Sequence, residues 1–80
     1  DLYIASSDGF VAEAELPSPT RLRGVVEAAV GEARTEVFSR TRPVQGLVNG
    51  RPETQGDYDE ARKTLSFRTS GRSTFEVGVR

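Results

Sequence analysis

Apolar and polar residues alternate near the start of the chain, which predicts β-strands. The alternation runs over residues 2–16 and is interrupted by Asp8-Gly9. An Asp-Gly pair between alternating runs is typical of a two-residue hairpin turn, whose central positions need positive φ. The pattern therefore predicts a β-hairpin over residues 2–16, with Glu13 and Glu15 on its polar face.

A second alternating region closes the sequence. Phe67 lies in the run 61–69, and Phe75 lies in the run 73–80, where apolar residues occupy every second position. Ser70-Gly71-Arg72 separates the runs and predicts a short turn. We expect a second hairpin, with both phenylalanines on its buried face.

The region between the predicted hairpins has a different spacing, with apolar residues three and four positions apart. This spacing is typical of one face of an α-helix. The residues that follow it are Leu22, Val25, Val26, Ala29, Val30, Ala33 and Val37. We predict an amphipathic helix that is capped by Ser18, with Pro19 as its first residue, or by Thr20, and that ends near Arg34. Gly31 offers an earlier end, which would leave residues 35–41 as a strand.

Residues 41–60 have the least regular pattern. A short apolar run at 44–48 precedes Asn49-Gly50, which predicts a strand that enters a type I′ turn. Pro43, Gly46 and Pro52 favour an edge strand or an irregular loop. The polar stretch 53–60 predicts a loop.

Together these elements predict an α+β fold of two layers. One amphipathic helix would pack on a four- to five-stranded, mainly antiparallel sheet, in the order hairpin, helix, weak strand, hairpin. Eighty residues make one small domain, residues 1–80. Because Leu2 begins a strand pattern at once and no Met precedes it, we expect the domain to come from a longer protein.

The composition excludes several kinds of chemistry. The chain has no Cys and no His, so it lacks thiolate ligands, disulfides and the usual general base near neutral pH. The alternating acids Asp57, Asp59 and Glu60 do not make a complete Ca²⁺ loop. No apolar run is long enough to span a membrane. We therefore expect no enzyme activity, no catalytic residues, no cofactor, no metal site and no membrane insertion.

Charge is distributed unevenly along the chain. Residues 1–20 carry a net charge of −4, residues 21–60 carry −1, and residues 61–80 carry +4. This asymmetry predicts a protein–protein interaction or assembly module that uses oppositely charged hairpins and an exposed sheet edge. The partner would be another protein or further copies of the chain. The candidate interaction residues are Glu13, Glu15, Arg62, Arg68, Arg72 and Arg80.

Two alternatives use the same charged residues. The arginines of the second predicted hairpin could bind a phosphate-rich ligand or nucleic acid, since guanidinium pairs with phosphate in bidentate fashion. The acidic whole-chain pI of about 5.4 does not favour nucleic acid. In the third hypothesis, Glu13 and Glu15 form the carboxylate pair of a hydrolase, because alternate residues of one strand share a face.

Overall fold

A computed structural model of the protein describes residues 2–52 and 57–80, and these residues form strands and turns without a helix. The described residues therefore contain no helix that could cross a membrane. Seven strands form one antiparallel sheet. Their bounds are β1 (Leu2–Ser7), β2 (Phe10–Ser18), β3 (Arg21–Ser39), β4 (Gln45–Val48), β5 (Arg51–Pro52), β6 (Asp57–Asp59) and β7 (Thr64–Gly78).

The two long strands β3 and β7 form the centre of the sheet and pair with each other along nearly their whole length. β1 and β2 follow one another along the free side of β3. β4 and β6 occupy separate stretches of the other side of β7, and β5 extends the sheet beyond β4. Each strand of the centre therefore has different neighbours at its two ends.

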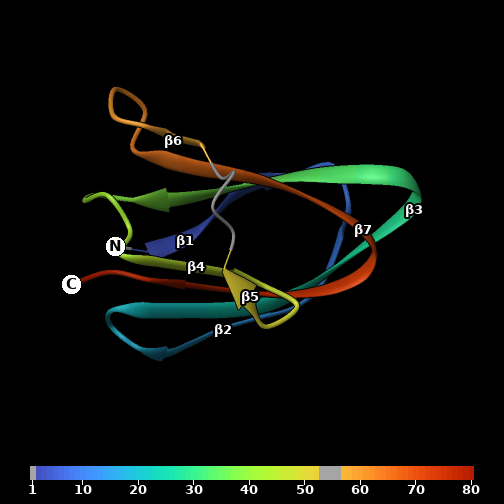
Figure 1. Cartoon of the computed structure of the whole chain (residues 1–80), viewed down its shortest axis with the longest axis horizontal. Coiled ribbons are helices and arrows are strands. Elements are labelled where there is room, and N and C mark those ends of the chain that lie inside the picture. The colour runs from blue at the N-terminus through green and yellow to red at the C-terminus, as the bar shows by residue number, and fades with distance from the viewer. Residues whose placement is uncertain (1, 53–56) are drawn as a thin grey trace.

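The sheet is folded over on itself, so that one end of the central ribbon lies above the other (Figure 1). We name the resulting layers by their edge strands. The β2 half contains β2, residues 21–27, residues 72–78, β4 and β5. The β1 half contains β1, residues 32–39, residues 64–70 and β6. The two halves share one hydrophobic core.

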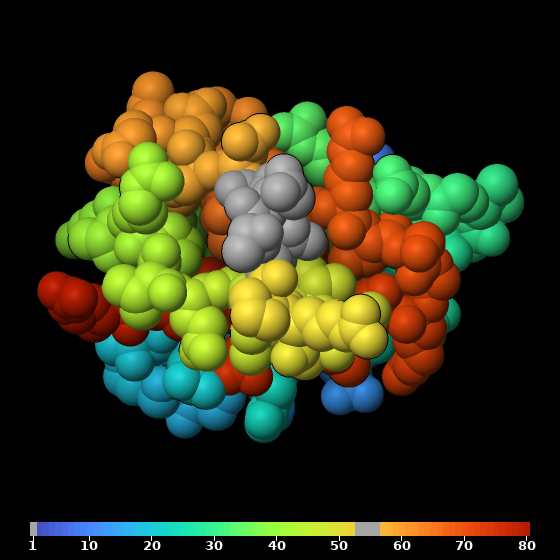
Figure 2. All heavy atoms as spheres, in the orientation of Figure 1, coloured from blue at the N-terminus to red at the C-terminus, as the bar shows by residue number. Residues whose placement is uncertain are grey.

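The central ribbon turns from one half to the other at two glycines with positive φ. Gly31 of β3 has φ 66° and Gly71 of β7 has φ 61°. Glu27 pairs with Arg72, and the next pairing joins Glu32 to Ser70, so β3 has three more unpaired residues than β7 at this corner. Extra residues and glycines of this kind bend a sheet sharply. The corner of β3 projects at one end of the molecule (Figure 2).

The third strand of the corner is the link between β1 and β2. Asp8 donates its N–H to the carbonyl of Arg34 at 3.2 Å, and its carboxylate accepts the Arg34 N–H at 2.5 Å. Gly9 lies so close to β3 that a Cβ there would be 2.8 Å from the Glu27 carbonyl oxygen. Asp8-Gly9 therefore leads the chain around the same corner instead of reversing it.

The core joins the two halves through an aromatic contact between residues of β7. The rings of Phe67, in the β1 half, and Phe75, in the β2 half, have centroids 5.2 Å apart. Phe75 also lies over Gly24, its register partner on β3, where a Cβ would be 2.6 Å from the ring. The remaining apolar residues of this cluster are Leu2, Leu22, Val26, Val37 and Val77.

The predicted helix is wrong, and with it the α+β fold class, because residues 21–39 form the strand β3 of an all-β fold. The buried residues of this strand alternate: positions 22, 24 and 26 before the corner, and 33, 35, 37 and 39 after it. An odd number of extra residues at the corner moves the buried set from even to odd positions. Two strand patterns in different phase thus imitate helical spacing.

Both predicted hairpins are also wrong, although their segments are strands. Asp8-Gly9 and Gly71 lie at corners within extended runs, and the actual first hairpin joins β2 to β3 through Pro19 and Thr20. Ser18, predicted as a helix cap, ends β2 and pairs with Arg21. Turns and corners both favour glycine. At both, the backbone adopts a positive φ or approaches another strand so closely that a side chain would clash.

The strand and type I′ turn predicted near Asn49-Gly50 are confirmed. β4 and β5 pair across this turn, with φ of 53° at Asn49 and 79° at Gly50. The Asn49 carboxamide holds the turn against β7, where its oxygen accepts the Thr74 N–H at 3.0 Å. Of the predicted polar loop, residues 53–56 lie outside the described residues, and Asp57–Asp59 form β6.

Candidate functional site

Charged side chains cover the outer face of the β2 half as cross-strand pairs. Glu15 of β2 accepts hydrogen bonds from Arg23 of β3 at 2.5 and 2.8 Å. Glu76 of β7 forms an ion pair with Arg21, and Arg23 is the register partner of both Glu15 and Glu76. The Glu15 carboxylate raises the pKa of Arg23, first through the hydrogen bond and then through charge. This row alternates acid and base across three strands.

The second row of charges on this face has more acid than base. Arg72 of β7 forms a short ion pair with Glu27 of β3 and lies 3.9 Å from Glu13 of β2. The Arg72 guanidinium is therefore bound mainly by Glu27, and Glu13 makes only a long contact with it. The excess negative charge of the face lies on its β2 side.

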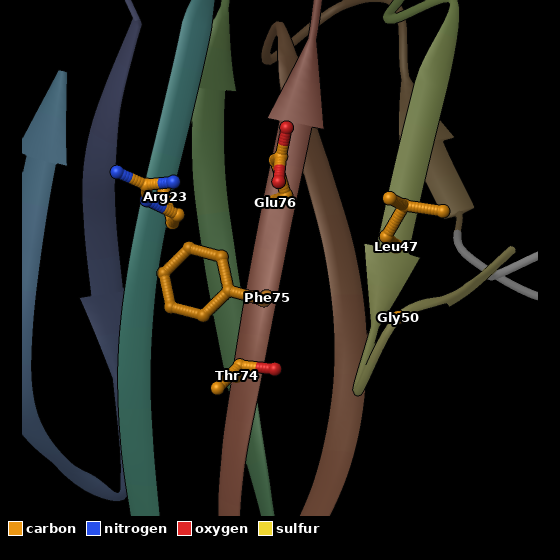
Figure 3. Close-up of a pocket in the computed structure, with 6 residues that line it drawn as sticks. All are labelled: Arg23, Leu47, Gly50, Thr74, Phe75 and Glu76. Carbon is orange, nitrogen blue, oxygen red and sulfur yellow. The ribbon is translucent and has the colours of Figure 1, made fainter. Parts of the chain in front are cut away.

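Two shallow hollows lie between these rows. One, of about 100 Å³, is lined by Glu13, Glu15, Arg23, Gly24, Val25 and Thr74. The other, of about 240 Å³, extends toward the β4–β5 hairpin and is lined by Arg23, Leu47, Gly50, Thr74, Phe75 and Glu76 (Figure 3). In this view the Phe75 ring points from β7 toward β3, away from the hairpin. Both hollows are open depressions on the sheet.

The outer face of the β1 half has a different arrangement, in which several groups converge on one carboxylate. Glu36 accepts hydrogen bonds from the Ser6 hydroxyl at 3.1 Å and from Arg62 at 3.2 Å, and Arg34 lies 3.4 Å from its other oxygen. These contacts lower the pKa of Glu36, the Ser6 hydrogen bond most and the charges of Arg62 and Arg34 after it. Glu36 thus holds two arginines at once.

A third arginine of this face has no carboxylate. Arg68 of β7 is the direct register partner of Arg34 of β3, and both side chains lie on the outer face. The Arg68 side chain makes no hydrogen bond or ion pair with any described residue. Like charges directly opposite on neighbouring strands destabilise a sheet.

The longest free edge of the sheet belongs to β1 and β2. Both strands pair with β3 on one side, and no described strand pairs with the other side. The side chains of β2 are largely exposed, including Phe10 at 67% and Leu16 at 49%. β2 carries Glu13, Glu15 and Pro17, residue types that hinder edge-to-edge pairing with the sheet of another molecule. β1 has no charged residue.

The predicted interaction residues fall into three places. Glu13, Glu15 and Arg72 meet on the outer face of the β2 half. Arg68 belongs to the β1 half, and Arg62, in the turn between β6 and β7, forms an ion pair with Glu36 of that half. Exposed Arg80 follows the end of β7. Of the oppositely charged side chains of the two chain ends, Glu13 and Arg72 approach each other across β3, at 3.9 Å.

Sequence analysis missed the residues that connect these charges. Arg23, Glu27, Arg34 and Glu36 lie on β3. Because a helix was predicted there, the sequence did not place these side chains beside those of β2 and β7. The alternation of Arg34 and Glu36 around buried Thr35 was the available indication of a strand. The hydrolase hypothesis for Glu13 and Glu15 remains a prediction.

The described residues contain no cluster of three or more His, Cys, Asp or Glu side chains that could hold a metal ion. The candidate sites are therefore an exposed strand edge next to carboxylates and a group of arginines. Comparison with known proteins found no matching family model, and no curated protein or solved structure matched the chain.

Proposed function

We propose that the protein is a non-enzymatic binding module that takes up an extended, basic segment of another protein as a new strand beside β2. The observation that carries this proposal is the free edge of β2, which pairs with β3 on one side only. Strand addition at such an edge obtains affinity from main-chain hydrogen bonds and selectivity from alternate side chains.

The side chains along β2 indicate the chemistry of the partner. Glu13 and Glu15 lie on the outer face, while Ala14, between them, pairs with inward-facing Gly24. A neighbouring strand places its own side chains about 5 Å from those of β2. Lys or Arg at alternate positions would face the two glutamates, and apolar residues between them would face Ala14 and Leu16.

The same charges disfavour a second copy of the chain at this edge. An antiparallel pairing of two β2 strands brings four carboxylates onto one face, and like charges on opposed strands repel. The sequence-based idea that oppositely charged ends match between molecules stays a prediction; within one molecule, Arg72 lies 3.9 Å from Glu13. The edge and its carboxylates remain as the basis of the proposal.

A peptide-binding experiment tests the proposal. The probe is a peptide of about eight residues, the length that spans β2, with Lys and Val at alternate positions. Fluorescence anisotropy should detect binding of this peptide and much weaker binding of peptides with Gln or Glu in place of Lys. Glu13→Gln with Glu15→Gln should weaken binding of the Lys peptide about tenfold, the scale expected for two cross-strand charge pairs.

Two controls separate strand addition from general charge attraction. Glu32→Gln removes an exposed carboxylate from the corner and should leave the affinity unchanged. Peptides N-methylated at odd or at even amides should differ, because only one set of amides faces the edge strand. Equal binding of both methylated peptides would overturn strand addition.

Sedimentation velocity tests the alternative occupant. The free protein should sediment as a monomer at low and at high salt. A dimer that breaks on addition of the Lys peptide would identify a second copy as the natural occupant of the edge and contradict the proposed partner.

A further inference from the structure

The arginines of the β1 half point to a second binding function, on the face of the molecule formed by the other layer. We propose that Arg34 and Arg68, supported by Arg62, bind a phosphate monoester dianion on the outer face of the β1 half. This proposal is independent of peptide binding at β2, because the two sites share no residue.

The first argument is the direct opposition of two guanidinium-bearing residues. Arg34 and Arg68 are register partners, so their Cβ atoms lie about 5 Å apart across the strands. Without a bound ligand, the repulsion between the two guanidinium groups destabilises the sheet. A dianion placed between the two side chains removes it and can accept paired hydrogen bonds from each guanidinium.

The second argument is the number of donors that remain available. Arg34 donates from Nη2 to the Ser66 hydroxyl at 3.2 Å, and the same nitrogen lies near Glu36. A guanidinium has five N–H donors, so most of those of Arg34 are left for a ligand. Arg68 uses none of its side-chain donors on described residues, and the Arg34 side chain is 52% exposed.

The third argument is that the arrangement is held in place before a ligand arrives. Glu36 has only 12% of its side chain exposed and fixes Arg34 and Arg62 from one side. The turn that carries Arg62 is held by the Asp59 carboxylate, which accepts its N–H at 3.1 Å. Preorganised donors lose less conformational entropy on binding.

The acidic groups of this face define the direction from which a dianion can approach. Asp8 and Glu36 line a hollow of about 310 Å³ on the β1 side of Arg34, together with Ser6 and Ser7. Asp57 of β6 pairs in register with Ser66 and makes no ion pair with a described residue. The favourable place is therefore between Arg34 and Arg68, over the β3–β7 pairing.

The experiment is a titration with inorganic phosphate, followed by NMR of the backbone amides and the arginine Nε–H groups. Phosphate should shift the signals of Arg34 and Arg68 in a saturable way, whereas equal ionic strength of chloride should not. Arg68→Gln should lower the affinity at least tenfold without loss of folding, because this side chain has no partner among the described residues.

Two further variants make the test specific. Arg80→Gln removes an exposed arginine from the end of β7 and should leave phosphate binding unchanged. Glu36→Gln should strengthen binding severalfold, because it removes a negative charge beside Arg34 and Arg62 while the glutamine oxygen can still accept a hydrogen bond that positions them. An equal loss in Arg68→Gln and Arg80→Gln would mean that only the net charge attracts the anion.

Different phosphate-bearing probes distinguish the source of the group. Glycerol phosphate and a phosphoserine peptide should compete with inorganic phosphate at the same signals. A single-stranded oligonucleotide carries phosphodiesters, which bear one charge per phosphate, and should compete more weakly per phosphate. If only the oligonucleotide binds, and Arg68→Gln abolishes that binding, the proposed monoester site is wrong and the face is a nucleic-acid surface.

Discussion

The two halves of the folded sheet bury apolar side chains in equal measure but treat polar groups differently. In the β2 half, Leu22, Val26, Phe75 and Val77 face the core, and the outer charges of β2, β3 and β7 pair across the strands. This half buries one hydroxyl residue, Ser73, which donates a hydrogen bond to the Ser70 carbonyl at 3.0 Å. The β1 half buries Leu2, Ala33, Val37 and Phe67, and in addition four hydroxyl residues: Thr35, Ser39, Thr64 and Thr69. On its outer face one arginine lacks a partner among the described residues.

The two halves thus differ in how far their buried polar groups are satisfied. Natural sequences depart from full satisfaction of polar groups mainly at functional sites. The Oγ1 atoms of Thr64 and Thr69 are buried without a hydrogen-bond partner in the described part of the chain, and Arg68, next to Thr69 on β7, is opposite Arg34. These departures gather in the β1 half, where the phosphate site is proposed.

The largest expected effect tests the core that the two halves share. Phe75→Ala removes a ring that is 1% exposed and that contacts both Phe67 and Gly24. We expect a loss of about 3–5 kcal/mol in the free energy of unfolding, measured by urea denaturation. A loss much below that of Phe67→Ala would contradict this role of Phe75 in the shared core.

A smaller effect is expected where a ring packs over a glycine. In Gly24→Ala the new Cβ would lie 2.6 Å from Phe75 Cζ and 2.7 Å from the Glu13 carbonyl oxygen. We expect destabilisation of about 1–3 kcal/mol, because backbone on one side prevents relaxation. Gly46→Ala is the matched control, since its Cβ would meet only Leu65, at 3.9 Å. Similar thermal midpoints for the two variants would contradict the close packing at Gly24.

The buried hydroxyls of the β1 half give a prediction of opposite sign. Thr69→Val replaces an unpartnered hydroxyl with a methyl group of the same shape and should stabilise the protein by about 1 kcal/mol. Thr35→Val should destabilise it, because the Thr35 hydroxyl is hydrogen-bonded to Ser7 at 3.0 Å. Chemical denaturation of both variants measures the difference. A loss in Thr69→Val would indicate a bound water as the partner.

The smallest effect concerns the pH dependence of stability. The folded-state pKa of Glu36 is lowered by Ser6, Arg62 and Arg34, so its contribution is present above the unfolded pKa of about 4.3. The contribution is lost as the pH falls from there through the folded pKa. Glu36→Gln should therefore flatten the acid side of a plot of urea midpoint against pH. An unchanged slope would show that Glu36 contributes nothing to the pH dependence of stability.

The sequence predicted the strands at both ends, the antiparallel pairing and the burial of Phe67 and Phe75, because alternation reports one buried face. Alternation could not reveal that the sheet folds over on itself. Gly31, Gly71 and Asp8-Gly9 occupy corners, and corners use the same residues as turns. The phase change within β3 then produced helical spacing from two strands, so Arg34 and Glu36 were never placed beside Arg62 and Arg68.

The pairing of β3 with β7 also determines how the chain can reach this structure. The pairing nearest the connecting segment joins Phe38 to Thr64, while the most distant joins Arg21 to Gly78. Every one of these pairings requires closure of the segment between the two strands, which costs conformational entropy before contacts repay it. Folding should therefore be slow for a chain of this size, on a timescale of about milliseconds to seconds. The β3–β7 pairing should start beside Phe38 and Thr64 and advance toward the corner, whereas the β2–β3 hairpin, closed by Pro19 and Thr20, can form earlier.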